Sequence, residues 1–510
     1  MLRSFVWRSF YQDSVVLMRL AGLLRERPGV REVAALMGTP ANQGLLAQAS
    51  LATPETQGAG PEDLLLVVDV EEAAAGEAAL EAARAFLTHR RDAAAESAAV
   101  QPRTLDAALA QLPGANLAVI SVPGAHARFE SMRALQRGLH VFLFSDNVPL
   151  ADELALKREA LRRGLLMMGP DCGTAYLNGV GLGFYNRVPR GRVGCVAASG
   201  TGLQAVASHL AALGEGLSQA IGVGGRDLSA EVGGLMSLAA LDALARDRNT
   251  EAVVLISKPP HPSVLQRLEE ALGRLGKPAV VCCLGAPARS APNTTAQARW
   301  VDTLEDAAQA TAARLQGRDW RPRAFDDAAA MRLRLAAART GRGARLVGLY
   351  SGGTLAHEAR LLLEPHLGPV AFNPDPDAQA GGHRLVDLGD DAYTVGRAHP
   401  MIDPSVRAEN LSRALAEPDV GVVLLDVVLG LGAHEDPSAS VLGALERHRG
   451  PRPVVVASVL GTRDDPQGLQ RQIDRLRAAG VEVWPSNAQA VRFAALVVAP
   501  QAESALLEEA

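Results

Sequence analysis

The segment RVGCVAASGTGL, residues 192–203, decides the fold of this chain. A short apolar run ends at Ser199, and Gly200 and Gly202 follow before an Ala- and Leu-rich segment begins. Glycines directly after a parallel strand let the backbone turn tightly into a helix. The segment therefore predicts a buried strand, a tight turn and a helix, which is the repeating unit of an α/β protein.

The same alternation of short β-branched runs and longer Ala-, Leu- and Arg-rich segments extends along the chain in both directions. Such alternation predicts parallel sheets covered by helices. The expected strands are VREVAALM, DLLLVVDV, NLAVISV, HVFLFS and GLLMMGP in the first third, SQAIGVGG, AVVLIS and PAVVCCLG in the middle, and RLVGLYSGG, GVVLLDVVLG, PVVVASVLG and VEVWPS in the last third.

A chain of 510 residues is too long for one hydrophobic core, and ordinary domain sizes suggest about three domains. We predict domains over residues 1–190, 191–335 and 343–510. The Gly- and Asn-rich segment LNGVGLGFYNRVPRG is expected to link the first two domains, and an Arg-rich stretch separates the last two.

The second and third predicted domains resemble each other in the order of their strands. The run ending in Ser199-Gly200-Thr201-Gly202 has a counterpart in the run ending in Ser351-Gly352-Gly353-Thr354. EAVVLISKPP corresponds to GVVLLDVVLG, and GKPAVVCCLGA corresponds to GPRPVVVASVLGT. Three matches in the same order predict an internal duplication.

Composition excludes several classes of protein. Apolar residues make up 48% of the chain, charged residues 21%, and the net charge is −5, so no nucleic-acid partner is expected. The first residues lack a signal peptide, and no apolar run approaches the roughly 20 residues that span a bilayer. The four cysteines have no metal-ligand spacing, which fits a reducing compartment. We expect a soluble cytoplasmic protein without a membrane partner.

The paired strand–helix junctions carry the strongest chemical signal. Amides at the start of a helix point at a common spot, and the helix dipole adds partial positive charge there. We therefore predict an anion site for phosphate or carboxylate at both junctions; the alternative is that the glycines serve tight packing alone. The predicted residues are Ser199, Gly200, Thr201, Gly202, Ser351, Gly352, Gly353 and Thr354.

Two further loops follow expected strands. Gly169-Pro170-Asp171-Cys172-Gly173 comes after GLLMM, and Gly224-Gly225-Arg226-Asp227 comes after SQAIGV. Arg226 could pair with an anionic substrate, because a guanidinium binds carboxylate or phosphate through two hydrogen bonds; the alternative is a surface pair with Asp227. Cys172 could be a nucleophile, but a buried thiol is the simpler interpretation.

The segment from Asp387 to Pro404 is rich in ionisable side chains. Its carboxylates could bind Mg²⁺ or tune an acid–base group, and Arg397 and His399 could hold an anion. A charged surface loop is the alternative, and no metal is predicted. His357, His366 and His434 lack a local motif and are assigned structural roles.

The run MMGPDCGTAYLNG, followed by RVGCVAASGTGLQAVASHL and AIGVGGRD, resembles the α-subunit of succinyl-CoA synthetase. ISVPGAH and SDNVPLAD are similar to its CoA-domain segments, and the last third resembles the ligase domain of its β-subunit. The resemblance implies a Rossmann-like CoA-binding-type domain followed by two flavodoxin-like domains. It also implies a CoA-type pocket at Asp146, Asn147 and residues 169–173. QDSV, MGTPAN, YSGGTLA and LGDDAYTVGRAHPMIDP resemble the FdrA family over nearly the whole chain.

The chain departs from succinyl-CoA synthetase where that enzyme carries its phosphohistidine. The stretch after PAVVCCLG reads GAPARSAPNTTAQA, and no histidine occurs between His261 and His357. The loop that supplies an orienting glutamate in the relative reads Ser257-Lys258-Pro259-Pro260 here, and no ATP-grasp domain is present. These departures predict that the chain alone does not make acyl-CoA from ATP.

The FdrA resemblance implies one subunit of an oxamate carbamoyltransferase in purine (allantoin) breakdown, converting oxalurate and phosphate to oxamate and carbamoyl phosphate. On this hypothesis the amides of the Ser199 junction and of Gly224 and Gly225 hold phosphate. Arg226 or Lys258 neutralises charge, and Arg397 or His399 binds the substrate carboxylate. The expected partners are other carbamoyltransferase subunits and a carbamate kinase, in a hetero- or homo-oligomer. A CoA-binding ligase and a non-catalytic scaffold are the alternatives.

Overall fold

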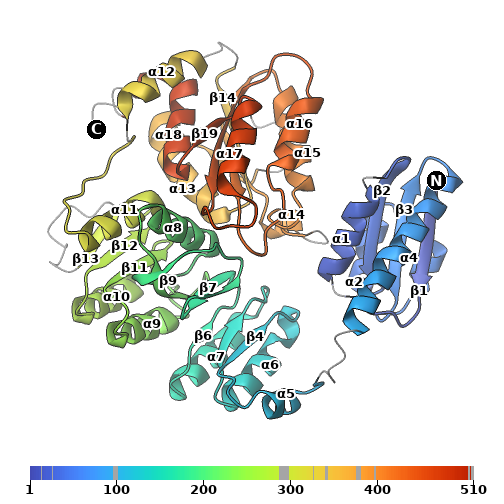
Figure 1. Ribbon diagram of the computed structural model, residues 1–510, viewed down its shortest axis with the longest axis horizontal. Helices are drawn as coiled ribbons and strands as arrows, with labels where there is room; N and C mark the ends of the chain where they lie inside the picture. Colours follow the sequence, from blue (N-terminus) through green and yellow to red (C-terminus); the bar gives the residue numbers. More distant parts are fainter. Residues whose placement is uncertain are drawn as a thin grey trace. The chain divides into compact units, whose positions relative to one another are not determined.

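The computed structural model describes residues 1–12, 14–25, 27–95, 102–286, 298–325, 327–338, 343–374, 381–394, 398–503 and 506. The chain forms two compact units, which we name the N-terminal unit and the main unit. The N-terminal unit comprises Met1–Leu112 with Asp391–His399, and the main unit comprises Pro113–Asp390 with Pro400–Ala510. Figure 1 shows the elements of both.

The N-terminal unit holds a three-stranded sheet in the order β1-β3-β2, in which both pairings are antiparallel. Helix α1 joins β1 to β2, and β3 inserts between them, which is a split βαβ arrangement. Leu64, Leu66 and Val68 of β3 are fully buried against α1 and α4. The elements are β1 (Leu2–Trp7), α1 (Ser14–Arg25), β2 (Val30–Met37), α2 (Pro40–Gln48), α3 (Pro54–Gln57), β3 (Leu64–Val70), α4 (Ala73–Ala95), α5 (Leu105–Gln111) and α14 (Asp391–Thr394).

This unit differs from the expectation of one parallel domain over residues 1–190. Two of its three strands were identified correctly, since VREVAALM forms β2 and LLLVVDV forms β3, whereas β1 was not among the expected strands. The direction of pairing of these strands was not predicted correctly. An apolar run followed by a helix does not reveal whether the next strand pairs parallel or antiparallel. The parallel Rossmann-like part is confined to a small sheet that begins after residue 112.

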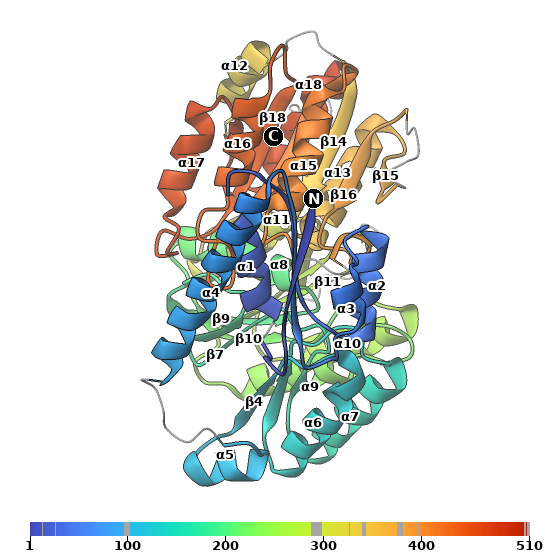
Figure 2. The ribbon, with the colours of Figure 1, turned by 90° about the vertical axis from the view of Figure 1, so that its right-hand side faces the viewer.

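That small sheet is parallel, in the order β4-β5-β6. Helices α6 and α7 lie beside each other along it (Figure 2). Its outer strand β4 exposes Val119 by 61%. The elements are β4 (Leu117–Ile120), α6 (Gly124–Gln136), β5 (His140–Leu143), α7 (Leu150–Arg162) and β6 (Met167–Met168).

The second sheet of the main unit has the order β13-β12-β11-β9-β10-β7-β8. Strands β9 to β13 are parallel, and the hairpin β7–β8 adds an antiparallel edge. The segment expected to be a linker therefore supplies part of this hairpin. The elements are β7 (Thr174–Leu177), β8 (Val180–Gly183), β9 (Arg190–Ala197), α8 (Gly200–Ala212), β10 (Leu217–Gly222), α9 (Leu235–Arg246), β11 (Ala252–Ser257), α10 (Pro262–Arg274), β12 (Ala279–Cys283), β13 (Ala298–Val301) and α11 (Leu304–Leu315).

The third sheet is parallel throughout, in the order β15-β16-β14-β17-β18-β19. Numbered from β14 and leaving out β15, its order is 2-1-3-4-5, and β9 to β13 have the same order, which is flavodoxin-like. The elements are α12 (Ala328–Ala338), β14 (Arg345–Tyr350), α13 (Gly353–Leu367), β15 (Ala371–Phe372), β16 (Arg384–Asp387), α15 (Ser405–Ala416), β17 (Val420–Val428), α16 (Ala439–Arg447), β18 (Val454–Leu460), α17 (Leu469–Ala478), β19 (Glu482–Trp484), α18 (Asn487–Val498) and a final 3₁₀ turn (Pro500–Ala502).

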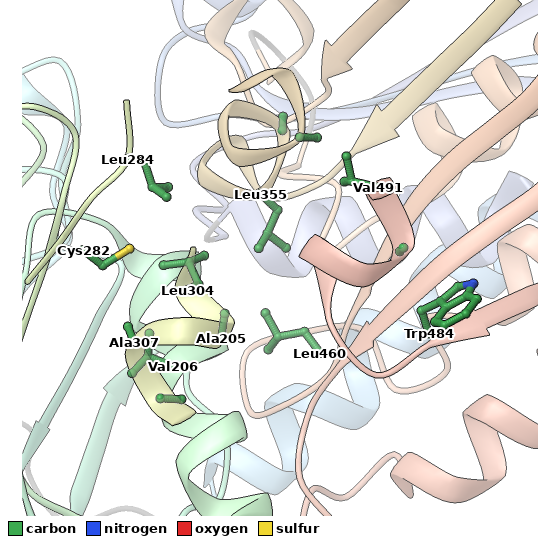
Figure 3. Close-up of a cluster of buried hydrophobic side chains, with 14 of the residues drawn as sticks. Ala205, Val206, Cys282, Leu284, Leu304, Ala307, Leu355, Leu460, Trp484 and Val491 are labelled. Atoms are coloured by element: carbon green, nitrogen blue, oxygen red, sulfur yellow. The ribbon is translucent and has the colours of Figure 1, made fainter. Parts of the chain in front are cut away.

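The second and third sheets share one hydrophobic core. Figure 3 shows Ala205 of α8 and Leu304 of α11 facing Leu355 of α13 and Leu460 of β18. The fold is thus mixed α/β with parallel sheets, as predicted. Within the described ranges no helix is both long and apolar enough to cross a membrane.

Candidate functional site

The starts of α8 and α13 face each other across the interface between the second and third sheets. The hydroxyl oxygens of Ser199 and Thr354 lie 2.5 Å apart. A side chain built on Gly352 would meet the Thr201 methyl carbon at 3.0 Å. The two predicted junctions therefore form one site.

Asn186 holds these two parts together. Its side-chain amide nitrogen donates to the Leu429 carbonyl at 3.0 Å and to the Asp465 carboxylate at 2.8 Å. Both acceptors belong to the part of the chain that forms the third sheet. Its amide oxygen accepts from Gln204 of α8 at 3.1 Å. Because all these groups are buried, the hydrogen bonds fix the position of α8 against the third sheet.

The start of α8 leaves backbone donors available. Ser199 is the N-cap, and its hydroxyl accepts from the Gly202 amide at 2.9 Å. No described residue accepts a hydrogen bond from the amides of Gly200 and Thr201. Two free amides at a helix start are an anion-binding arrangement. The wall behind them is apolar, because Ile256 of β11 lies under Gly202.

The start of α13 already contains an anion. Asp426 of β17 is completely buried, and its carboxylate accepts from the amides of Ser351 and Gly352 at 2.7 and 2.8 Å. The Arg407 guanidinium, 2% exposed, donates to the Asp426 carbonyl at 2.8 Å and lies 4.0 Å from its carboxylate. Burial raises the pKa of Asp426, and Arg407 and the two amides oppose this rise.

A second carboxylate flanks the same turn. Asp387 ends β16, and its oxygen lies 2.2 Å from where a β-carbon on Gly353 would stand. It is half-buried, and among the described residues it accepts one hydrogen bond, from the Gly389 amide at 3.0 Å. Burial, helped by the charges of Asp426 and Asp390, raises the pKa of Asp387 to about 6, although the Gly389 hydrogen bond and Lys258 lower it.

The predicted pairing of the two serines is shifted by one residue. Ser199 is the N-cap of α8, whereas Gly352, and not Ser351, is the N-cap of α13. Ser351 instead lies in the turn before the cap, where its hydroxyl accepts from Arg407 at 3.3 Å. Sequence alignment on the serines hides this shift because both turns read Ser-Gly.

Lys258 and His357 lie beside the facing helix starts. The charge of exposed Lys258 lowers the pKa of both Asp387 and His357, so it lies within electrostatic range of α13. Burial is the largest cause of the lowered pKa of His357, which is bonded to the Leu284 backbone at the end of β12. The sequence alone predicts a structural role for His357, but its proximity to Lys258 makes it part of the site's surroundings.

The other predicted loops adjoin the start of α8. A β-carbon on Gly200 would lie 3.3 Å from the Thr174 hydroxyl, directly after residues 169–173. Gly224, at φ +84°, packs against the Pro170 carbonyl. The amide of Asp171 donates to the Ser145 carbonyl next to Asp146 and Asn147, which are exposed.

The Arg226 side chain forms an ion pair and a hydrogen bond with other residues of the protein. Its guanidinium contacts the buried Glu153 carboxylate at 2.8 Å and the Val148 carbonyl at 2.8 Å, and 48% of the side chain is exposed. The alternative of an Arg226–Asp227 surface pair was wrong, because Asp227 is fully buried and pairs with Lys157 at 2.8 Å. Substrate binding by Arg226 stays a prediction.

Cys172 is a buried thiol. Burial raises its pKa to about 12, and its sulfur lies 3.6 Å from the Thr174 carbonyl. A thiol with so high a pKa carries almost no thiolate at neutral pH, so the nucleophile alternative is not supported.

The segment around His399 divides between the two units. Burial lowers the pKa of His399 to about 4, so this imidazole is neutral at pH 7 and offers no positive charge to an anion. Arg397 lies outside the described residues. In the part of the chain that the structure describes, no group of three or more His, Cys, Asp or Glu side chains could hold a metal ion.

Sequence reasoning missed Asp426 and Arg407. A signal was available for the first, because Asp426 is the one charged residue inside the apolar run GVVLLDVVLG. A carboxylate in a buried parallel strand requires partners, and it therefore marks either a site or an internal ion pair. Arg407 lies in an ordinary amphipathic helix segment and gave no comparable signal.

Comparisons with known proteins agree with this architecture. The CoA-ligase family model matches residues 349–497, and the model described as AllF, heavy metal-associated domain, matches residues 1–103. The latter region contains no cysteine, the ligand that soft metals prefer, so its residues do not fit a thiolate metal site.

Two relatives span different shares of the chain. The chain is 39% identical to the uncharacterized protein YahF of Escherichia coli, over 94% of this chain and 95% of YahF. Succinate–CoA ligase [ADP-forming] subunit alpha 1 of Archaeoglobus fulgidus is 28% identical over 37% of this chain and 63% of its own length. Dinucleotide-forming acetyl-coenzyme A synthetase 1 of Ca. Korarchaeum cryptofilum, a solved structure, has 17% identity, with 77% of this chain and 85% of that chain covered, at a TM-score of 0.30.

The parallel sheets, the facing helix starts and the match of residues 349–497 to the CoA-ligase model define the class: an α/β protein with a CoA-ligase domain, similar in part to a succinate–CoA ligase α-subunit. Within that class, the chain belongs to the family of Escherichia coli YahF.

Proposed function

We propose that this protein is a subunit of a carbamoyltransferase that uses phosphate to cleave a carbamoylated amide, as in the conversion of oxalurate and phosphate to oxamate and carbamoyl phosphate. The observation that carries the proposal is the start of α8, where the amides of Gly200 and Thr201 have no acceptor among the described residues. The match of residues 1–103 to a domain described as AllF, a name associated with allantoin breakdown, supports the pathway.

Each group near α8 has a chemical role in this reaction. The amides of Gly200 and Thr201 hold the phosphate, and the hydroxyls of Ser199 and Thr354 donate to it or to the carbamoyl oxygen. Donors aimed at the oxygen that gains charge lower the barrier to attack on the carbamoyl carbon. Lys258 supplies a positive charge at the same edge.

The proposal also accounts for what the site lacks. No histidine occurs in residues 262–356, so the segment after β12 cannot carry a phosphohistidine. His357 is nearby, but its position on α13 and its bond to the Leu284 backbone differ from a mobile loop residue. Free phosphate as a substrate needs only the amide site.

The CoA-ligase family match favours a second candidate, an acyl-CoA ligase that binds CoA beside residues 169–173. A non-catalytic scaffold is the third. Incubation with radiolabelled ATP followed by quench at neutral and acid pH separates these: acid-labile protein phosphate, absent from a His357→Ala variant, supports the ligase. Isothermal titration with CoA gives a second, independent measure.

The direct test combines the purified protein with candidate partner subunits, oxalurate and phosphate, and follows carbamoyl phosphate by ³¹P NMR. We expect a carbamoyl phosphate signal that requires both substrates. No signal with any partner combination, in either reaction direction, would reject the proposal.

The phosphate position is tested by Thr201→Trp, because the larger side chain fills the space between Thr201 and Gly352. We expect at least about a tenfold loss of phosphate affinity by titration calorimetry, equivalent to about 1.4 kcal/mol. Thr311→Ser, a buried change on α11 away from the site, is the matched control. Unchanged phosphate affinity in Thr201→Trp contradicts the assignment.

A further inference from the structure

The two helix starts differ in the side chains on the strands beside them. At the level of Ala197, the last residue of β9, the neighbouring strands carry Gly222 on one side and Ile256 on the other. At the level of Tyr350, the last residue of β14, β16 carries Asp387, and the β17 register places Asp426 on the other side. The α8 side is therefore uncharged and the α13 side carries two carboxylates.

These two carboxylates have unequal environments. Asp426 is fully buried and satisfied by two amides, and Arg407 adjoins it. Asp387 is half-buried and accepts a hydrogen bond from Gly389, the one that the described residues supply. Asp426 is thus committed to holding the turn, whereas Asp387 has capacity to exchange a proton.

Asp387 lies on the α13 side of the proposed anion position. Its carboxylate contacts the α-carbon side of Gly353, the residue before Thr354. The Thr354 hydroxyl is 2.5 Å from the Ser199 hydroxyl, which caps the helix that holds the anion. The residue that Asp387 contacts, Gly353, is therefore directly followed in the chain by the one that shares a hydroxyl contact with Ser199.

From this arrangement we propose that Asp387 is a catalytic residue that carries the proton from the attacking hydrogen phosphate to the leaving nitrogen of the substrate. The inference rests on the proposed function. A phosphate oxygen forms a bond to the carbamoyl carbon, and the bond from that carbon to the amide nitrogen breaks. The ionised Asp387 accepts the proton of the hydrogen phosphate and gives it to the departing nitrogen, which becomes an NH₂ group. Protons and charge balance without another reactant.

The electrostatic surroundings suit this role. The groups that face Asp387 are Asp426 of β17, Asp390 of the following loop, Lys258 after β11 and the Gly389 amide, and burial dominates their sum. The resulting pKa of about 6 lies near neutral pH, where one carboxyl group can act in turn as base and acid.

Activity and pH profile test the inference where the enzyme assay works. In Asp387→Asn we expect kcat to fall about 10²- to 10⁴-fold, the range for loss of a general acid–base group. The rising limb of kcat/KM near pH 6 should disappear, and Asp387→Glu should restore part of it. Asp419→Asn is the matched control, because Asp419 directly precedes β17 and so lies at the end of that strand away from Asp426. An Asp387→Asn profile that keeps the limb overturns the inference.

A binding experiment separates failure of this inference from failure of the proposed function. Sulfate stays a dianion from pH 5 to pH 8, so its affinity reports only on protein groups. In the wild type, sulfate affinity should weaken as pH rises through about 6, because Asp387 becomes negative beside the anion. Asp387→Asn should bind sulfate without that step. Identical pH dependence in both proteins places Asp387 away from the anion and overturns the inference, whatever the assay with substrate gives.

Discussion

The two helix starts of the main unit have the same strand order around them and opposite chemistry. The start of α8 is lined by Ile256 and Gly222 and holds two amides that find no acceptor in the described part of the chain, whereas the start of α13 is filled by Asp426 and flanked by Asp387. A shared topology therefore fixes where a site lies but not what it binds. The residues at the ends of the two neighbouring strands decide whether a helix start accepts an outside anion or contains one of its own.

The largest effect is expected from removing the internal anion. Asp426→Ala leaves Arg407 buried without its carboxylate and leaves two amides without an acceptor, so we expect a loss of about 3–5 kcal/mol in the free energy of unfolding. Urea unfolding measures it. Asp419→Ala, a carboxylate that is 57% exposed, should cost less than about 1 kcal/mol. Equal losses in the two variants would mean that Asp426 is not the internal anion of α13.

A smaller effect is expected from Asp387 and depends on pH. Because its pKa is raised from 3.8 to about 6 in the folded protein, the unfolded chain ionises first as pH rises. Stability contributed by the protonated group is complete below pH 4, falls between pH 4 and 6, and is constant above. The fall is at most about 3 kcal/mol.

Asp387→Asn removes this titration. Compared with the wild type, the variant should therefore become relatively more stable as the pH is raised from 4 to 6.5. Thermal unfolding over that range checks the difference. Parallel stability curves for the two proteins would show that Asp387 titrates at its ordinary pKa.

The smallest effect on stability is expected from adding one methyl group at each of the two helix starts. In Gly353→Ala the β-carbon would stand 2.2 Å from the Asp387 carboxylate and displace it, whereas in Gly200→Ala the nearest atom is 3.3 Å away. Both variants should stay within about 1 kcal/mol of the wild type, because only a side-chain end must move. The pH-dependent step between pH 4 and 6 should shrink in Gly353→Ala and persist in Gly200→Ala. The same step in both would contradict the close approach of Asp387.

Much of this fold was readable from the sequence. The β-branched runs identified most of the strands, and the glycines after Ser199 and Ser351 located the two turns, because such patterns reflect local backbone requirements. The strands that were not expected are β1, β7, β8, β13, β15 and β16. The antiparallel pairing of β3 with β1 and β2 was not readable, since strand direction depends on contacts distant in sequence.

The candidate site was predicted in part for a related reason. Open amides follow from a Gly-rich turn, so Gly200 and Thr201 could be named in advance. Whether the amides of Ser351 and Gly352 are already occupied depends on Asp426, which is about 75 positions away in the chain. A local motif contains no information about such a partner. The one-residue offset of the helix caps has the same origin.

The joining of both helix starts in one polypeptide has a kinetic consequence. Asn186 and Asp465 fasten α8 to the third sheet, and the connecting chain prevents these parts from diffusing apart. The effective concentration of one helix start near the other is thus set by the fold and not by the amount of protein. Dilution should leave this pair assembled, so any loss of activity on dilution would report on other subunits alone.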